Sequence, residues 1–109
     1  MPWLLRDDKV LAALEVAESF RDRSRGLLGR DRLEGALLIR PCHQVHSFGM
    51  RFPIDVAFCT KDLVVVRTLS LRPGRITRPS LRCCCVIEAE AGAFDRWRLR
   101  PGDQLAVEQ

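Results

Sequence analysis

The side chains most able to do chemistry gather in one short stretch of this sequence, CHQVHSFGMRFPID, which runs from Cys42 to Asp55. It holds both histidines of the chain, one of its five cysteines, a methionine and an aspartate. Imidazole, thiolate and carboxylate groups are common metal ligands, and they also serve as proton donors and acceptors in catalysis. The stretch is therefore the first candidate for a functional surface.

The spacing of the two histidines disfavours a metal site within this stretch. His43 and His46 would share one face of a helix, but on an extended strand they point to opposite sides. The proline before Cys42 and the run QVHSF favour the extended form. His46 would then need ligands from elsewhere, such as Asp55, Glu88 or Cys42, and no paired Cys-x-x-Cys zinc signature is present. The sequence thus predicts no metal site and identifies no cofactor.

Catalysis would require a nucleophile or an acid and base pair within hydrogen-bond reach. Asp55 could orient the imidazole of His46, with Cys42 or Ser47 as nucleophile, or His46 and Glu88 could act as base and acid. No nucleophile elbow or other local signature supports either arrangement. The plainer interpretations are a turn or cap hydrogen bond for Asp55 and a solvated strand position for Glu88. A hydrolase-like or metal-dependent enzyme using His46, Asp55 and Glu88 therefore stays an alternative.

A basic segment follows, LRPGRITRPSLR, which holds four arginines and no acidic residue. Residues 41–82 carry seven basic and two acidic side chains, a charge of +5, so the positive excess of a chain with net charge +4 lies there. Arginines of this kind can contact phosphates. However, the chain has only five Phe, two Trp and no Tyr, so it has few aromatic side chains on which nucleic-acid bases could stack. It also has no nucleic-acid-binding motif. Nucleic acid is disfavoured as a partner, and a weak nucleic-acid binder acting through residues 72–82 is the other alternative.

The leading hypothesis is a small non-catalytic binding module for a small anionic ligand or a protein partner. Polar groups converge on one stretch, and a positive loop should border it. The residues that we expect to line this site are His46, Met50, Asp55, Glu88, Arg75 and Arg78.

Composition predicts one globular domain, residues 1–109. Hydrophobic residues make up 47% of the chain and charged residues 29%, which is typical of a folded protein. The apolar runs are too short to span a bilayer, and the N-terminus does not resemble a secretory signal, so we expect a cytoplasmic location. Three of the cysteines are consecutive, which favours reduced thiols packed as small apolar residues.

Local patterns predict a mainly β fold. A hairpin should join residues 2–5 to residues 10–17 through a turn at residues 7–9, and one short helix should lie near residues 20–28, capped by Ser19 and ended by Gly29. Turn residues such as the two Pro-Gly pairs separate the later segments. The further strands are expected at residues 36–39, 44–48, 54–59, 63–71, 84–90 and 104–108. This spacing predicts a compact antiparallel sandwich or barrel.

Four segments of the chain carry a family resemblance. In order along the chain they are FRDRSRGLLGRDRLEGALLI, VHSFGMRFPIDVAF, VIEAEAG and LRPGDQLAV. Together they resemble the small bacterial and archaeal proteins of the domain of unknown function 192 family, over about residues 10–107. The resemblance implies a compact, mostly β fold of jelly-roll-like character with a short helix near the start. It implies no activity, because none is established for the family.

Overall fold

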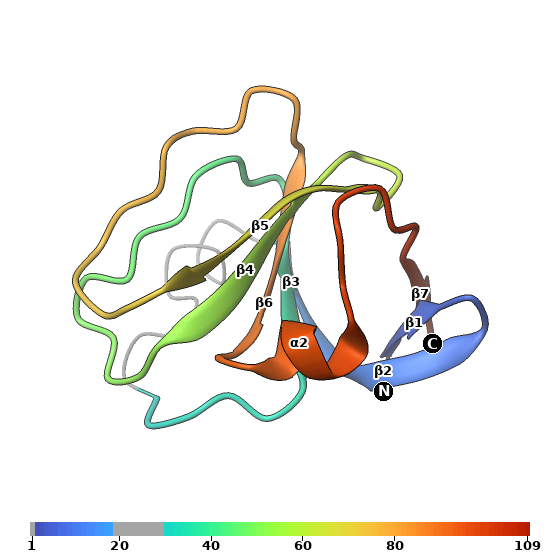
Figure 1. Ribbon diagram of the computed structural model, residues 1–109, viewed down its shortest axis with the longest axis horizontal. Helices are drawn as coiled ribbons and strands as arrows, with labels where there is room; N and C mark the ends of the chain where they lie inside the picture. Colours follow the sequence, from blue (N-terminus) through green and yellow to red (C-terminus); the bar gives the residue numbers. More distant parts are fainter. Residues whose placement is uncertain (1, 19–29) are drawn as a thin grey trace.

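The chain folds around one strongly curved β-sheet (Figure 1). The computed structural model describes residues 2–18 and 30–109, so the helix expected near residues 20–28 lies outside the described residues. The elements are β1 (Trp3–Arg6), β2 (Lys9–Ala17), β3 (Ala36–Ile39), β4 (Ile54–Cys59), β5 (Val65–Leu71), β6 (Cys85–Glu90), α2 (Ala93–Trp97) and β7 (Ala106–Glu108). The prediction of a mainly β fold is confirmed, whereas sequence patterns did not predict α2.

The strand order in the sheet is β5-β4-β6-β3-β2-β1-β7. Neighbouring strands pair antiparallel, except that β2 and β3 run parallel. This pair corrects the expectation of an antiparallel arrangement throughout. Parallel strands need a long crossover connection, and residues 18–35 connect β2 to β3. A tight turn would instead have reversed the chain and made the pair antiparallel.

The turns expected from Asp and Gly residues occur where the sequence places them. Asp7 and Asp8 have φ of 53° and 66°, as a type I′ hairpin turn between β1 and β2 requires. The Pro-Gly pairs place Gly74 and Gly102 at φ of 78° and 96°, values that suit glycine. Turn chemistry was therefore a dependable local signal.

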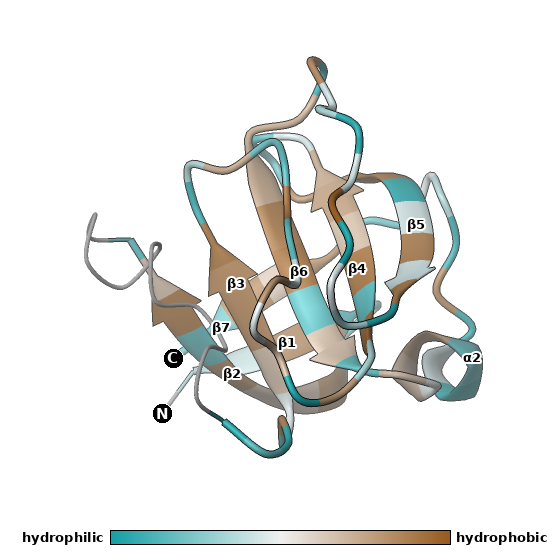
Figure 2. Cartoon of the chain, turned by 90° about the vertical axis from the view of Figure 1, so that its left-hand side faces the viewer, coloured by the Kyte–Doolittle hydropathy of each residue, from teal (hydrophilic) through white to brown (hydrophobic). Residues whose placement is uncertain are grey.

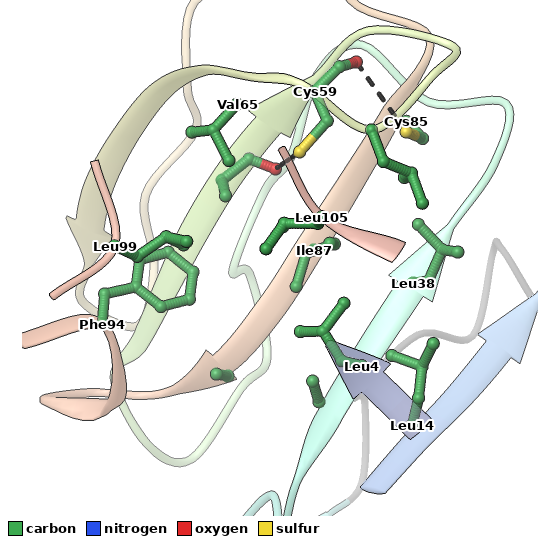
Figure 3. Close-up of a cluster of buried hydrophobic side chains, with 14 of the residues drawn as sticks. Leu4, Leu14, Leu38, Cys59, Val65, Cys85, Ile87, Phe94, Leu99 and Leu105 are labelled. Carbon is green, nitrogen blue, oxygen red and sulfur yellow. Dashed lines mark hydrogen bonds between the residues drawn. The ribbon is translucent and has the colours of Figure 1, made fainter. Parts of the chain in front are cut away.

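Alternation along the strands sends apolar side chains to both faces of the sheet. All six residues of β4 are buried, and Figure 2 shows the central strands as mostly apolar in colour, with hydrophilic bands in β4 and β6. One face forms a first cluster, drawn in Figure 3, and the other forms a second cluster. The first cluster includes Leu4, Leu14, Leu38, Ala57, Cys59, Cys85, Ile87, Phe94 and Leu105. The second includes Leu37, Met50, Ile54, Val56, Phe58, Leu71, Cys83 and Val86.

The curved sheet bends until the regions beside its two edge strands meet. Val64 forms an isolated bridge with Gln104, and the Val65 N–H donates to the Asp103 carbonyl oxygen at 2.9 Å. The Leu105 N–H donates to the Leu63 carbonyl oxygen at the same distance. These contacts protect part of both edges without joining β5 and β7 in a continuous ladder. The sheet is therefore barrel-like but not a closed barrel.

Two long loops, residues 40–53 and 72–84, run side by side, and we call them the paired loops (Figure 1). The prediction of a strand at residues 44–48 is wrong, because this segment forms only an isolated bridge between His46 and Ile76. Three backbone bonds of 2.7 to 2.8 Å join the loops: Ser47 N–H to the Arg75 carbonyl, Thr77 N–H to Val45, and Ser80 N–H to His43. Several prolines interrupt both segments and prevent a regular ladder.

The described residues contain no helix with the length and apolar character needed to cross a bilayer.

Replacing Gly35 by Ala should lower the free energy of unfolding by roughly 2 kcal/mol, measured by urea denaturation. Gly35 has φ of 76°, and an added Cβ would lie 2.5 Å from the carbonyl oxygen of Ala13. Gly74→Ala and Gly102→Ala are the matched controls, since both have positive φ but open space around the Cβ position. They should each cost only about 1 kcal/mol. Equal losses at all three positions would show that the β2 backbone does not restrict Gly35.

Candidate functional site

The carboxylate of Asp55 holds the start of α2 against β4. Its Oδ2 accepts hydrogen bonds from the backbone N–H groups of Gly92, at 3.0 Å, and Phe94, at 3.1 Å. Its Oδ1 accepts from the Ser70 hydroxyl at 2.9 Å. The side chain is buried, and both oxygens have donors. Asp55 thus makes the cap hydrogen bonds that sequence reasoning gave as its plainer role, but to a helix that the sequence did not predict.

Glu88 lies in the middle of β6, opposite Leu37 on β3 and Val56 on β4. Its residue is 4% exposed, and its carboxyl group has no hydrogen bond within the described residues. Burial raises the pKa of this carboxyl from its ordinary value of 4.5 to about 7. The interpretation of Glu88 as a solvated strand residue is therefore wrong.

The two carboxylates face opposite sides of the sheet. Asp55 alternates with Val56 along β4 and shares the side of Ala57, which belongs to the first cluster. Glu88 alternates with Ile87 along β6 and lies on the side of the second cluster. The structure therefore does not bring Asp55 and Glu88 to one hollow.

His46 lies apart from both carboxylates, exposed on the paired loops. Its ring stacks on Phe48, with 5.3 Å between ring centroids and 23° between ring planes. Its Nδ1 accepts a hydrogen bond from the Phe48 N–H at 3.3 Å. No hydrogen bond or ion pair joins His46 to Asp55 or Glu88 in the described residues. The acid and base pairs considered from sequence are not assembled.

The remaining predicted site residues divide between core and surface. Met50 is 8% exposed and packs in the second cluster. Arg75 and Arg78 are exposed on the paired loops. Their backbone carbonyls are used internally: Arg75 accepts from Ser47, and Arg78 accepts from the Arg67 guanidinium at 3.0 Å. Their guanidinium groups form no hydrogen bond or ion pair with other described residues, and both residues are exposed.

Within residues 2–18 and 30–109, no three His, Cys, Asp or Glu side chains are grouped so as to hold a metal ion. Two cysteines of the triple run pack in the core, and the middle one, Cys84, is exposed. Cys85 lies opposite Cys59 in the first cluster, while Cys83 belongs to the second. Hydrogen bonding to Cys85 and burial raise the pKa of the Cys59 thiol, which stays protonated.

The paired loops expose apolar side chains that sequence reasoning did not single out. Phe48 is 51% exposed, Ile76 58% and Leu81 90%. Exposed arginines accompany them along residues 72–82, where no acidic residue occurs. The sequence did contain a signal of this exposure: Ile76 and Leu81 lie within a basic segment that lacks the alternation of apolar and polar residues typical of a half-buried strand.

Ser47 fixes the shape of this surface. It is fully buried, and its hydroxyl donates to the Arg72 carbonyl oxygen at 2.5 Å. The same hydroxyl oxygen accepts from the Arg75 N–H at 2.9 Å. Because one buried side chain joins both ends of the Pro-Gly turn, the exposed Phe48 and Ile76 are held by ordered backbone.

Comparisons with known proteins agree with this fold. The family model for DUF192, described as an uncharacterized ACR, matches residues 4–107. A UPF0127 protein of Pyrococcus horikoshii is 29% identical over 97 residues, which cover 84% of each chain.

Two solved structures are similar in fold. A protein of unknown function from Novosphingobium aromaticivorans has a TM-score of 0.78 and 17% identity, covering 96% of this chain and 82% of that one. A protein from Sinorhizobium meliloti, proposed to be a transcription regulator, has a TM-score of 0.80 and 20% identity, covering 97% and 91%. At these identities the likeness concerns the fold alone.

Proposed function

We propose that this chain, which belongs to the domain of unknown function 192 family, is a non-catalytic module that binds an acidic protein partner through the paired loops. Because the members of this family are uncharacterised, the proposal rests on the surface of this chain. The observation that carries this proposal is the exposure of Phe48, Ile76 and Leu81 beside four arginines.

Charge and apolar exposure at one place support a protein partner. Exposed apolar side chains next to unpaired guanidinium groups suit a surface that presents both carboxylates and apolar groups. Arginine and aromatic residues are also enriched where binding energy concentrates. A small anion would use the arginines but would leave Phe48 and Ile76 in water. The paired loops therefore fit a protein surface better than a small ligand.

The separation of the titratable groups supports a non-catalytic role. General acid and base catalysis needs its groups within hydrogen-bond reach of one reacting atom. Here Asp55 and Glu88 lie on opposite faces of the sheet, and His46 is exposed on the paired loops, which pack over the Glu88 face through Val45 and Met50. An enzyme that used both carboxylates on one substrate would need a rearrangement of the sheet.

Nucleic acid is the second candidate for the same surface. The arginines at residues 72–82 could contact phosphates, and the fold neighbour from Sinorhizobium meliloti is proposed to be a transcription regulator. The exposed Phe48 could stack on a base. The experiment below separates this class from a protein partner.

We expect a short peptide of alternating Glu and Leu to bind, measured by calorimetry and NMR, and the matched Gln and Leu peptide to bind far more weakly. Arg75→Ala and Ile76→Ser should each weaken binding roughly tenfold, because each removes a group from the centre of the surface. The matched controls are Arg100→Ala, at another exposed arginine, and Val10→Ser, at another exposed β-branched apolar residue.

Two results would contradict the proposal. Peptide binding that is indifferent to Arg75 and Ile76 would place the interaction elsewhere. Binding of duplex DNA with strong salt dependence, lost in Arg75→Ala while the acidic peptide fails to bind, would assign the surface to nucleic acid.

A further inference from the structure

One edge of β2 lacks a strand partner over part of its length. The register pairs β2 with β3 only from Leu14, opposite Ala36, to Ala17, opposite Ile39. Of the preceding residues, Lys9, Val10, Ala12 and Ala13 pair with β1, and a register shift leaves Leu11 without a partner there. On the other side Gly35 lies against the Ala13 carbonyl, and Lys9–Ala12 have no described strand beside them. At about 3.3 Å per residue this free edge extends for roughly 13 Å, enough for a short added strand.

A cleft of about 590 Å³ lies along this free edge. β2 forms one wall, through residues such as Leu11 and Ala13, and α2 forms another, through Ala93 and Trp97. Figure 1 shows α2 next to β2 on this side of the sheet. Leu11 and Trp97 are partly buried and pack against the first cluster, so each wall has an apolar side chain anchored in the core.

The cleft has an acidic lining in a protein of net charge +4. Three carboxylates line it, Glu15, Glu34 and Glu90, against one cation, Arg96. Each carboxylate already holds an arginine in an exposed ion pair: Glu15 with Arg30, Glu34 with Arg32, and Glu90 with Arg96. Exposed pairs of this kind contribute little to stability and exchange readily. Guanidinium groups from a ligand could therefore take their places.

We propose that the free edge of β2 binds an extended peptide segment that carries Lys or Arg side chains, added to the sheet as a further strand. Backbone hydrogen bonds to Lys9–Ala12 provide the affinity, as in other cases of strand addition. Alternate side chains of the peptide then lie against Leu11 and Trp97 or toward Glu34 and Glu90. This site is separate from the paired loops and would bind a partner of opposite charge.

The test uses an acetylated and amidated peptide of alternating Arg and Val, followed by Trp fluorescence and by NMR of the β2 amides. A second peptide has the same sequence but is N-methylated at alternate residues, which blocks ladder hydrogen bonds and keeps the charge. A third replaces Arg by Glu. We expect the first to bind, with shifted and exchange-protected amides in Lys9–Ala12, the second to bind at least about tenfold more weakly, and the third not to bind.

Glu90→Gln should weaken binding of the first peptide several-fold, while Glu108→Gln, on β7 and outside the cleft lining, should not. Equal binding of the parent and N-methylated peptides would overturn strand addition, because only charge would then be recognised. Shifts confined to residues outside β2 and α2 would overturn the location. Absence of binding by all three peptides would overturn the proposal as a whole.

Discussion

Replacing Glu88 by Gln should raise the free energy of unfolding by about 3 kcal/mol at a pH of about 8 and change it little at a pH of about 4. The reason is the cost of ionising this carboxyl in the folded chain. Burial without a hydrogen-bond donor raises its pKa from 4.5 to about 7. The unfolded chain therefore loses the proton at lower pH than the folded chain does.

The direction of the pH dependence follows from this difference. Below a pH of 4.5 the carboxyl is neutral in both states and costs no extra free energy. Between 4.5 and about 7 the unfolded state ionises first, so the stability of the natural protein falls as pH rises. Above about 7 the full cost is present. Gln cannot ionise, so the variant should lack this part of the pH dependence.

Urea denaturation over a pH series measures this effect, with Glu90→Gln as the control. Glu90 is two residues away on the same strand but exposed, and it pairs with Arg96. Its replacement should shift stability by less than about 1 kcal/mol. If the natural protein and Glu88→Gln give parallel curves, then Glu88 does not ionise at the cost that its burial implies.

Replacing Asp55 by Ala should lower the free energy of unfolding by roughly 3 kcal/mol. The substitution leaves three donors without their acceptor: the Ser70 hydroxyl and the N–H groups of Gly92 and Phe94. Hydrogen bonds to a buried carboxylate are stronger than those between neutral groups. Because two of the donors belong to the start of α2, the helix should separate from β4.

Ser70→Ala is the matched control, since it removes one of the three bonds and keeps the carboxylate. We expect a loss of about 1 kcal/mol. Hydrogen exchange gives a second measurement: the Gly92 and Phe94 amides should exchange much faster in Asp55→Ala and stay protected in Ser70→Ala. Equal stability of the two variants would show that Asp55 does not hold α2 in place.

The two buried carboxylates have opposite energetic roles, although both stand in strands of the sheet centre. Asp55 has donors for both oxygens and stabilises the fold, whereas Glu88 has none in the described residues and destabilises it near neutral pH. Their residue type alone could not distinguish these roles, because the donors of Asp55 come from residues 70, 92 and 94.

The sequence by itself determined the local structure. The apolar segments at residues 36–39 and 54–59 are strands with those bounds, and the Asp7–Asp8 turn forms the opening hairpin. Strand alternation, positive φ at Asp or Gly and the fixed φ of Pro depend on neighbours a few residues apart. These features can therefore be read without knowing the tertiary structure.

Only the tertiary structure decided which chemical groups meet. The pairing of β2 with β3 in parallel, the contact of Asp55 with α2 and the face taken by Glu88 all depend on residues far apart in the sequence. A shift of one residue in register reverses the face of every side chain, and local patterns in fully buried strands do not specify that register. For this reason the sequence located His46, Asp55 and Glu88 as notable residues but could not show that the sheet separates Asp55 from Glu88, or that no hydrogen bond within the described residues joins His46 to either.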